Sequence, residues 1–201
     1  MGGLGLMFRR RAIQAHPTAG SSIALYDWLV GNKDGYIDLP IFAKMGWTYI
    51  FNFERDEAHL TAQSSGYLCS GNFEIYHSTY SEARIDIIPG GEWVWNSFGG
   101  ATSFAFMPDG VYRNGSKLTS HTLSANGDRT FRIFASSSSS GKMGAWMKLK
   151  NLEVFDETGK AVHLFLPCQI DGIVGLYDVI GQLFAPNIYE NEQLGLIKDE
   201  Q

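Results

Sequence analysis

Short runs of alternating apolar and polar residues, separated by glycine-rich turns, extend over most of the chain. Residues 47–53 are rich in aromatic and β-branched side chains, and residues 84–87 alternate with a period of two. Alternation of this kind is typical of strands that have one buried and one solvated face. No helical period persists beyond a turn or two. The pattern predicts an all-β domain built as a sandwich or jelly roll.

Turn-forming residues mark the ends of these runs. Asn114 and Gly115 suit a type I′ hairpin turn, because both central residues of that turn need positive φ. Pro167 is expected to end a strand. Asp178 and Gly181 predict a turn before the chain pairs back on itself. We expect this final hairpin to lay apolar residues over an open end of the sandwich.

The first 22 residues lack sustained alternation, and Pro17 interrupts any helix begun after the arginines. We therefore expect residues 1–22 to form an extended N-terminal arm and residues 23–201 to form one sandwich domain. The arm is either a terminus without a role or a docking element that orders against an acidic surface of a neighbouring subunit. The candidate partner-binding residues of the arm are Leu4, Leu6, Met7, Phe8, Arg9, Arg10 and Arg11.

Composition and charge narrow the possible partners. The net charge of −5 argues against nucleic acid, because a polyanion-binding surface needs a basic stripe. No apolar segment is long enough to cross a bilayer. Cys69 and Cys168 have no ligand-like spacing, so two buried free thiols are expected, with a disulfide between them as the alternative.

Three segments occur in a familiar order. They are Tyr-Ile-Asp at 36–38 with the strand pattern at 47–53, the hairpin at 109–115, and the closing run at 164–184. Together they resemble the concanavalin A-like lectin/glucanase superfamily, particularly the laminin-G-like jelly rolls encoded by tailed phages and gut bacteria. The resemblance implies an antiparallel two-sheet jelly-roll sandwich.

The same resemblance implies a non-enzymatic structural protein of a tailed-phage virion. Such a capsid decoration, head-fibre or tail-associated subunit would act through protein–protein contacts, as a homo-oligomer bound to other virion proteins. It would be assembled in the host cytoplasm and located in the virion. The first alternative is a carbohydrate-binding module that attaches to a host surface glycan, and the second is a glycoside hydrolase.

Few ionisable residues are arranged for bond-making. Glycosidases need two carboxyl groups at a fixed separation, and Glu54 and Asp56 share one strand face without a third acidic residue at position 58. The alternative is that these carboxylates belong to a solvated loop, as acidic residues after a strand usually do. The five histidines have no metal-ligand spacing, and no loop has the acidic density of a calcium site. We therefore expect no enzyme activity, no metal and no cofactor.

Tryptophans supply the candidate sugar site. A spacing of two residues places Trp93 and Trp95 on one side of a strand, where they could stack on a sugar ring while Asn96 fixes its orientation. The alternative is that both indoles fill the core. The other three tryptophans are expected in the core: Trp28, Trp47 and Trp146.

Overall fold

The computed structural model describes residues 17, 20–31, 35–55, 66–77, 82–87, 94–97, 100–135, 147–188 and 194–199, with the side chains of residues 77, 82–87 and 94–97 left out. This part of the chain contains seventeen β-strands and no helix. Accordingly, no described helix is long and apolar enough to span a membrane. The expected arm, residues 1–22, falls almost wholly outside the described residues.

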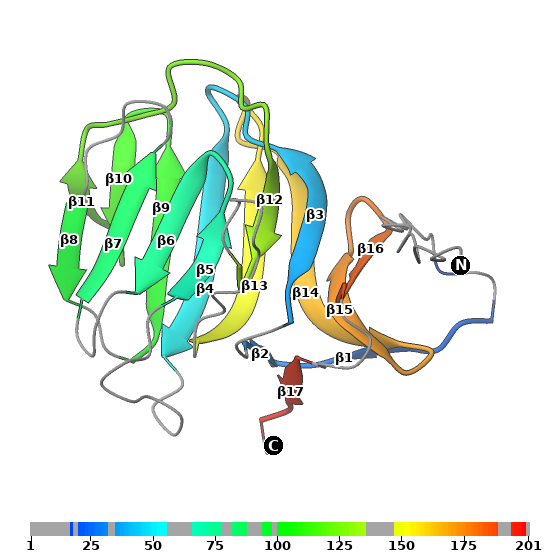
Figure 1. The fold of residues 1–201 in the computed structure, drawn as a ribbon. Helices are drawn as coiled ribbons and strands as arrows, with labels where there is room; N and C mark the ends of the chain where they lie inside the picture. The colour runs from blue at the N-terminus through cyan, green and yellow to red at the C-terminus, as the bar shows by residue number, and fades with distance from the viewer. Residues whose placement is uncertain are drawn as a thin grey trace, which may run out of the picture.

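Two antiparallel sheets pack face to face (Figure 1). The large sheet has 11 strands, eight of them in the order β11 (Ser116–Thr119), β10 (Gly110–Arg113), β9 (Thr102–Met107), β4 (Thr48–Arg55), β13 (Met147–Phe155), β14 (Ala161–Ile170), β15 (Ile173–Asp178) and β16 (Leu183–Pro186). The other three are β1 (Ile23–Leu25) on β14, β2 (Trp28–Val30) on β13, and β17 (Gly195–Ile197) on β2.

The small sheet has 6 strands in the order β3 (Ile37–Phe42), β12 (Thr130–Ile133), β5 (Gly66–Ser70), β6 (Phe73–His77), β7 (Glu82–Ile87) and β8 (Val94–Ser97). Every pairing within both sheets is antiparallel. The predicted fold class, an antiparallel two-sheet sandwich of the jelly-roll kind, is confirmed.

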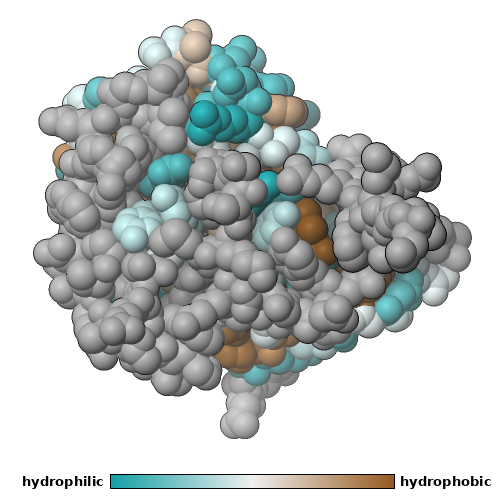
Figure 2. Space-filling model, in the orientation of Figure 1, coloured by the Kyte–Doolittle hydropathy of each residue, from teal (hydrophilic) through white to brown (hydrophobic). Residues whose placement is uncertain are grey.

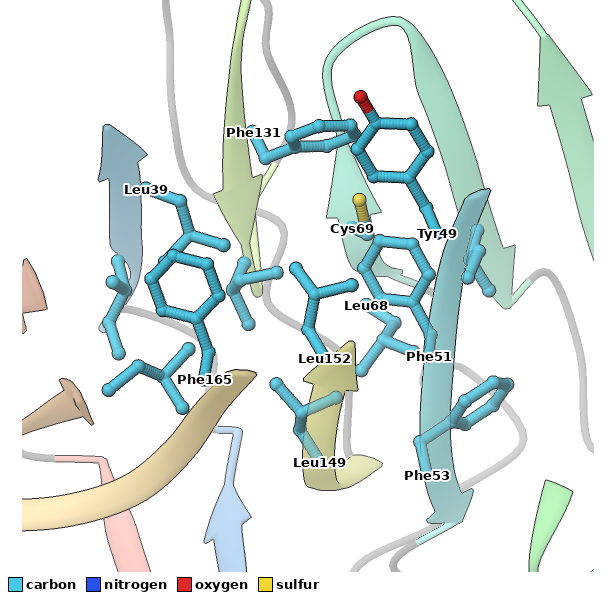
Figure 3. Close-up of a cluster of buried hydrophobic side chains, with 14 of the residues drawn as sticks. Leu39, Tyr49, Phe51, Phe53, Leu68, Cys69, Phe131, Leu149, Leu152 and Phe165 are labelled. Atoms are coloured by element: carbon cyan, nitrogen blue, oxygen red, sulfur yellow. The ribbon is translucent and has the colours of Figure 1, made fainter. Parts of the chain in front are cut away.

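The core lies between the sheets and combines aromatic rings with aliphatic side chains (Figure 3). Alternation along β4 turns Tyr49, Phe51 and Phe53 inward, and all three are almost completely buried. Phe131 of the small sheet packs on Tyr49, with ring centroids 5.4 Å apart. The aromatic run that predicted a strand at 47–53 therefore supplies one wall of the core.

Both cysteines are buried and free, as the sequence favoured. Cys69 belongs to the main core, whereas Cys168 belongs to a small separate cluster with Ile170 and Phe184. Burial raises the pKa of the Cys69 thiol and raises that of Cys168 to about 12. Both side chains are therefore neutral packing groups at physiological pH.

The hairpin between β10 and β11 turns as predicted. Asn114 has a φ of 46° and Gly115 a φ of 80°. Both values lie in the left-handed region that a type I′ turn requires. The side chain of Asn114 also reaches back to β9, where its Oδ1 accepts a hydrogen bond from the Ser103 N–H at 2.8 Å.

The prediction that Pro167 ends a strand is wrong, because β14 continues through it to Ile170. The Pro167 carbonyl accepts a hydrogen bond from the Tyr26 N–H at 3.0 Å. In an antiparallel strand, the N–H and C=O of one residue point to the same neighbouring strand. The N–H that Pro167 lacks would therefore point to the edge of β14 where its partner changes from β13 to β1. No ladder bond with β13 is lost there, since that pairing ends at Phe165.

The final hairpin closes one side of the sandwich, as expected. Val174, Leu176 and Ala185 of β15 and β16 belong to the main core. Beyond β16, Asn187 forms a bridge to Ile37 of the small sheet. The C-terminal hairpin therefore joins the two sheets through backbone hydrogen bonds.

Candidate functional site

Most of the site residues predicted from the sequence lie outside the residues that the structure describes. Trp93 and all seven arm residues from Leu4 to Arg11 are outside the described residues. Trp95 and Asn96 belong to β8 in the small sheet, but their side chains are not described. The stacking platform and the docking arm therefore stay predictions.

A polar groove of about 480 Å³ lies on the outer face of the large sheet. Asn52 of β4 and Ser103 of β9 alternate with the buried phenylalanines of those strands, so they point away from the core. The groove is lined by Trp28, Asn52, Ser103, Asn114, Lys150 and Asn151, among others. Ligand sites in proteins commonly enclose about 300–1,000 Å³, so this groove has the size of a small-molecule site.

A β-bulge in β13 shapes the middle of the groove. The pairing of β13 with β4 shifts register between Leu149 and Asn151. The core-facing residues on either side, Leu149 and Leu152, are fully buried, whereas Lys150 is exposed and Asn151 half-buried. The extra residue places two consecutive polar side chains at the groove, an arrangement that bulges often provide beside functional sites.

Hydrogen bonds hold the groove amides in place. Asn52 Nδ2 donates to Asn151 Oδ1 at 2.6 Å and to Glu153 Oε1 at 3.1 Å. Asn151 thus uses its amide oxygen as an acceptor and directs its two N–H donors elsewhere. Asn114 is held from the opposite side of the groove by its bond with Ser103. The amides are therefore fixed in orientation before any ligand arrives.

Trp28 forms the apolar wall of the groove. It is buried, as predicted, but it lies on the face of β2 opposite the core residue Leu29, so it is not part of the main core. Its Nε1–H donates to both carboxylate oxygens of Asp199 at 3.2 Å. The ammonium groups of Lys148 and Lys150 lie 5.2 and 5.6 Å from its ring centroid, a cation–π arrangement.

A second hollow, of about 230 Å³, lies at the end of the sandwich beside Trp47. Trp47 is half-buried and packs against the main core, in line with its predicted core position. Its ring faces the Lys44 ammonium at 4.0 Å, and its Nε1–H donates to Glu157 Oε2 at 2.6 Å. The residues that line this hollow are mostly apolar, so the larger groove, with its amides and hydroxyls, is the better candidate site. Trp146, the remaining core candidate, lies outside the described residues.

Only one of the two candidate catalytic carboxylates lies within the described residues. Glu54 makes an ion pair with Lys148, and Asp56 is outside the described residues. Within the described ranges, no group of three or more His, Cys, Asp or Glu side chains is placed to hold a metal ion.

A buried carboxylate, Asp178, is instead bound into the fold. Its Oδ2 lies 2.6 Å from His163 Nδ1, and its Oδ1 accepts the N–H groups of Leu164 and Ile180 at 3.0 and 3.1 Å. Burial alone would raise the pKa of Asp178, but hydrogen bonds from His163, Gly181 and Leu164 lower it overall. The turn predicted from Asp178 is present, and the carboxylate organises it.

The sequence interpretation missed the groove residues Asn52, Asn151 and Lys150. One signal for them was available: asparagine is depleted in strands, and Asn52 interrupts an otherwise apolar and aromatic run at an outward position. In the sequence, the bulge that turns Lys150 and Asn151 outward is visible only as an interruption of the alternation, which does not by itself identify a bulge.

Comparisons with known proteins support the fold. No family model matches the chain, and no curated protein matches it. Among solved structures, the chain resembles a proposed carbohydrate-binding protein from Bacteroides ovatus ATCC 8483, with a TM-score of 0.60 and 12% sequence identity. The likeness covers 87% of this chain and 61% of that protein, so this chain spans about three fifths of its length. At this identity, the likeness shows a shared all-β sandwich.

Proposed function

We propose that this protein binds carbohydrate through the groove on the outer face of its large sheet, by contact and without bond-making. The observation that carries the proposal is the fixed set of amides around Asn52, Asn114 and Asn151. The proposed role of the Bacteroides ovatus structure that shares the fold gives further support. Carbohydrate binding is also the first alternative that the sequence raised.

The chemistry of the groove suits a sugar. Each sugar hydroxyl both donates and accepts hydrogen bonds, and so does each asparagine amide. The amides of Asn52 and Asn151 are held by each other and by Glu153, so little side-chain freedom is lost when a ligand binds. The indole of Trp28 supplies an apolar wall for the less polar face of a sugar ring.

Two substitutions test the groove. Ala101, which is exposed and lines the groove, becomes a bulky obstruction in Ala101→Trp, and we expect binding to be lost. Asn52→Ala removes the hydrogen bond that orients Asn151, and we expect affinity to fall by about tenfold, since one such bond is worth roughly 1–1.5 kcal/mol. A glycan array identifies a ligand, and titration calorimetry measures both variants.

The matched control is Ala161→Trp, an exposed alanine of the same sheet at the start of β14, next to the turn after β13. Its affinity should equal that of the wild type. Trp95→Ala tests the platform predicted from the sequence. If Trp95→Ala abolished binding while Ala101→Trp did not, the sugar site would lie on β8. A wild-type protein that binds no glycan on a broad array would contradict the proposal.

The structural role in a virion is our second proposal, and one observation favours it. Among the described strands, β1 pairs only with β14, and all three of its residues are exposed, with Ile23 at 40% and Leu25 at 42%. Figure 2 shows apolar atoms at the lower edge of the molecule, where Figure 1 places β1, β2 and β17. An exposed apolar edge strand is a template for pairing with another chain. Such pairing would fit a homo-oligomeric subunit located in a phage particle.

For this second role we expect the purified protein to be an oligomer that the double variant Ile23→Lys, Leu25→Lys converts to monomers. Two charged side chains on the edge would oppose strand pairing between copies. Light scattering coupled to size-exclusion chromatography measures the mass. Val179→Lys, which places a lysine at another exposed apolar position, is the control and should leave the oligomer intact. A monomeric wild type would rule out assembly through this edge.

A further inference from the structure

Two ammonium groups share the Trp28 ring, but only one of them has a carboxylate partner. Lys148 pairs with Glu54. Lys150 makes no ion pair with any described residue, although its ammonium lies 5.6 Å from the same ring centroid. The two ammonium groups repel each other, so a negative charge placed beside Lys150 would be electrostatically favourable.

The carboxylates around the groove are already engaged. Glu153 accepts a hydrogen bond from Asn52, and Asp199 accepts the Trp28 indole N–H. Neither they nor Glu54 line the groove, whereas Lys150 does, and it is the only charged residue among the described lining residues. A ligand in the groove therefore meets a positive charge and a set of neutral amides.

We propose that the glycan bound in this groove carries an anionic group, a uronate carboxylate or a sulfate ester, which pairs with Lys150. The inference rests on the proposed carbohydrate-binding function and adds the class of sugar to it. The bulge in β13 makes Lys150 and Asn151 neighbours on the groove side. One anionic group can accept a charge-assisted hydrogen bond from the Lys150 ammonium and a second bond from the Asn151 amide.

The strength of this pairing follows from its exposure. Lys150 is exposed, so water and salt screen the interaction. We expect Lys150→Gln to weaken binding of an acidic glycan by about two- to fivefold at low salt, and the loss to shrink as salt is raised above physiological strength. Binding of a neutral glycan should not change.

The test uses two pairs of polysaccharides and the full-length protein. Polygalacturonate and its carboxyl-reduced form differ in the carboxylate, and dextran sulfate and dextran differ in the sulfate. The variants are Lys150→Gln and, as a control, Lys160→Gln, which changes another exposed lysine in the turn after β13. Affinity electrophoresis or calorimetry at two salt concentrations gives the dissociation constants.

Tighter binding of one acidic member of a pair, lost in Lys150→Gln and kept in Lys160→Gln, supports the proposal and identifies the anion. Equal loss in the two lysine variants overturns it, because that result indicates attraction by overall charge. The proposal of an anionic glycan is also overturned if neutral glycans bind, if Ala101→Trp blocks that binding and if Lys150→Gln does not change it. The proposed carbohydrate-binding function stands in that case. Absence of binding to every polysaccharide overturns the carbohydrate function itself.

Discussion

Asp178→Ala should lower the free energy of unfolding by about 3 kcal/mol at neutral pH, because removing a buried carboxylate leaves its hydrogen-bond partners unsatisfied. The partners are the His163 ring and the N–H groups of Leu164 and Ile180. Asp178 is fully buried, so water cannot replace the lost acceptor without opening the turn. Urea denaturation of wild type and variant measures the difference.

The effect should depend on pH in one direction. The folded-state pKa of Asp178 is lowered, so the ionised carboxylate contributes stability that is fully present above its unfolded pKa of about 3.9. That contribution is lost as the pH falls through the folded pKa. The gap between wild type and Asp178→Ala should therefore narrow when the measurement is repeated at about pH 3.

The control for this experiment is Asp109→Ala. The pKa of Asp109 is also lowered, by hydrogen bonds from Tyr112 and Lys117, but its side chain is exposed. We expect its removal to leave the unfolding midpoint almost unchanged. A loss equal to that of Asp178→Ala would show that the buried network around Asp178 has no special role in stability.

Phe131→Ala should also cost a large share of the stability, about 3–5 kcal/mol, as expected for a fully buried phenylalanine whose removal leaves a cavity. Its ring lies 5.4 Å from Tyr49, 6.3 Å from Phe51 and 5.7 Å from Phe73, measured between centroids. It therefore links β12 of the small sheet to β4 of the large sheet. Guanidinium denaturation followed by tryptophan fluorescence gives the change.

Phe42→Ala is the matched control, since Phe42 belongs to the same sheet but is 49% exposed. It should change stability by less than about 1 kcal/mol. Phe131→Leu should fall between the two, because leucine refills part of the cavity. If Phe131→Ala cost no more than Phe42→Ala, the two sheets would not depend on this aromatic contact.

Local patterns in the sequence predicted most strands, and the reasons for the exceptions are physical. The strand patterns at residues 47–53 and 84–87 correspond to β4 (Thr48–Arg55) and β7 (Glu82–Ile87). The bulge in β13 between Leu149 and Asn151 was not predicted. A bulge and a break between strands look alike in sequence, because both interrupt the alternation at one residue.

The candidate site was harder to predict, because it depends on register between distant strands. Asn52 meets Asn151 because β4 pairs with β13, and His163 meets Asp178 because β14 pairs with β15. Alternation shows which face a residue is on, but not which residue of another strand lies opposite. The spacing of Trp93 and Trp95 can be read from a single strand, without knowing which strand pairs with it. The sequence therefore predicted a sugar site at these tryptophans and not at the groove.

The order in which partners become available has a consequence for folding during synthesis. β1 and β2 leave the ribosome well before their partners, because β1 pairs with β14 and β2 pairs with β13 and β17. The bridge from Asn187 to Ile37 can form only after all the other strands except β17 have been synthesised. Nascent chains therefore carry unpaired apolar strands until β13 and β14 emerge, a state that favours aggregation and slow, late closure of the sandwich.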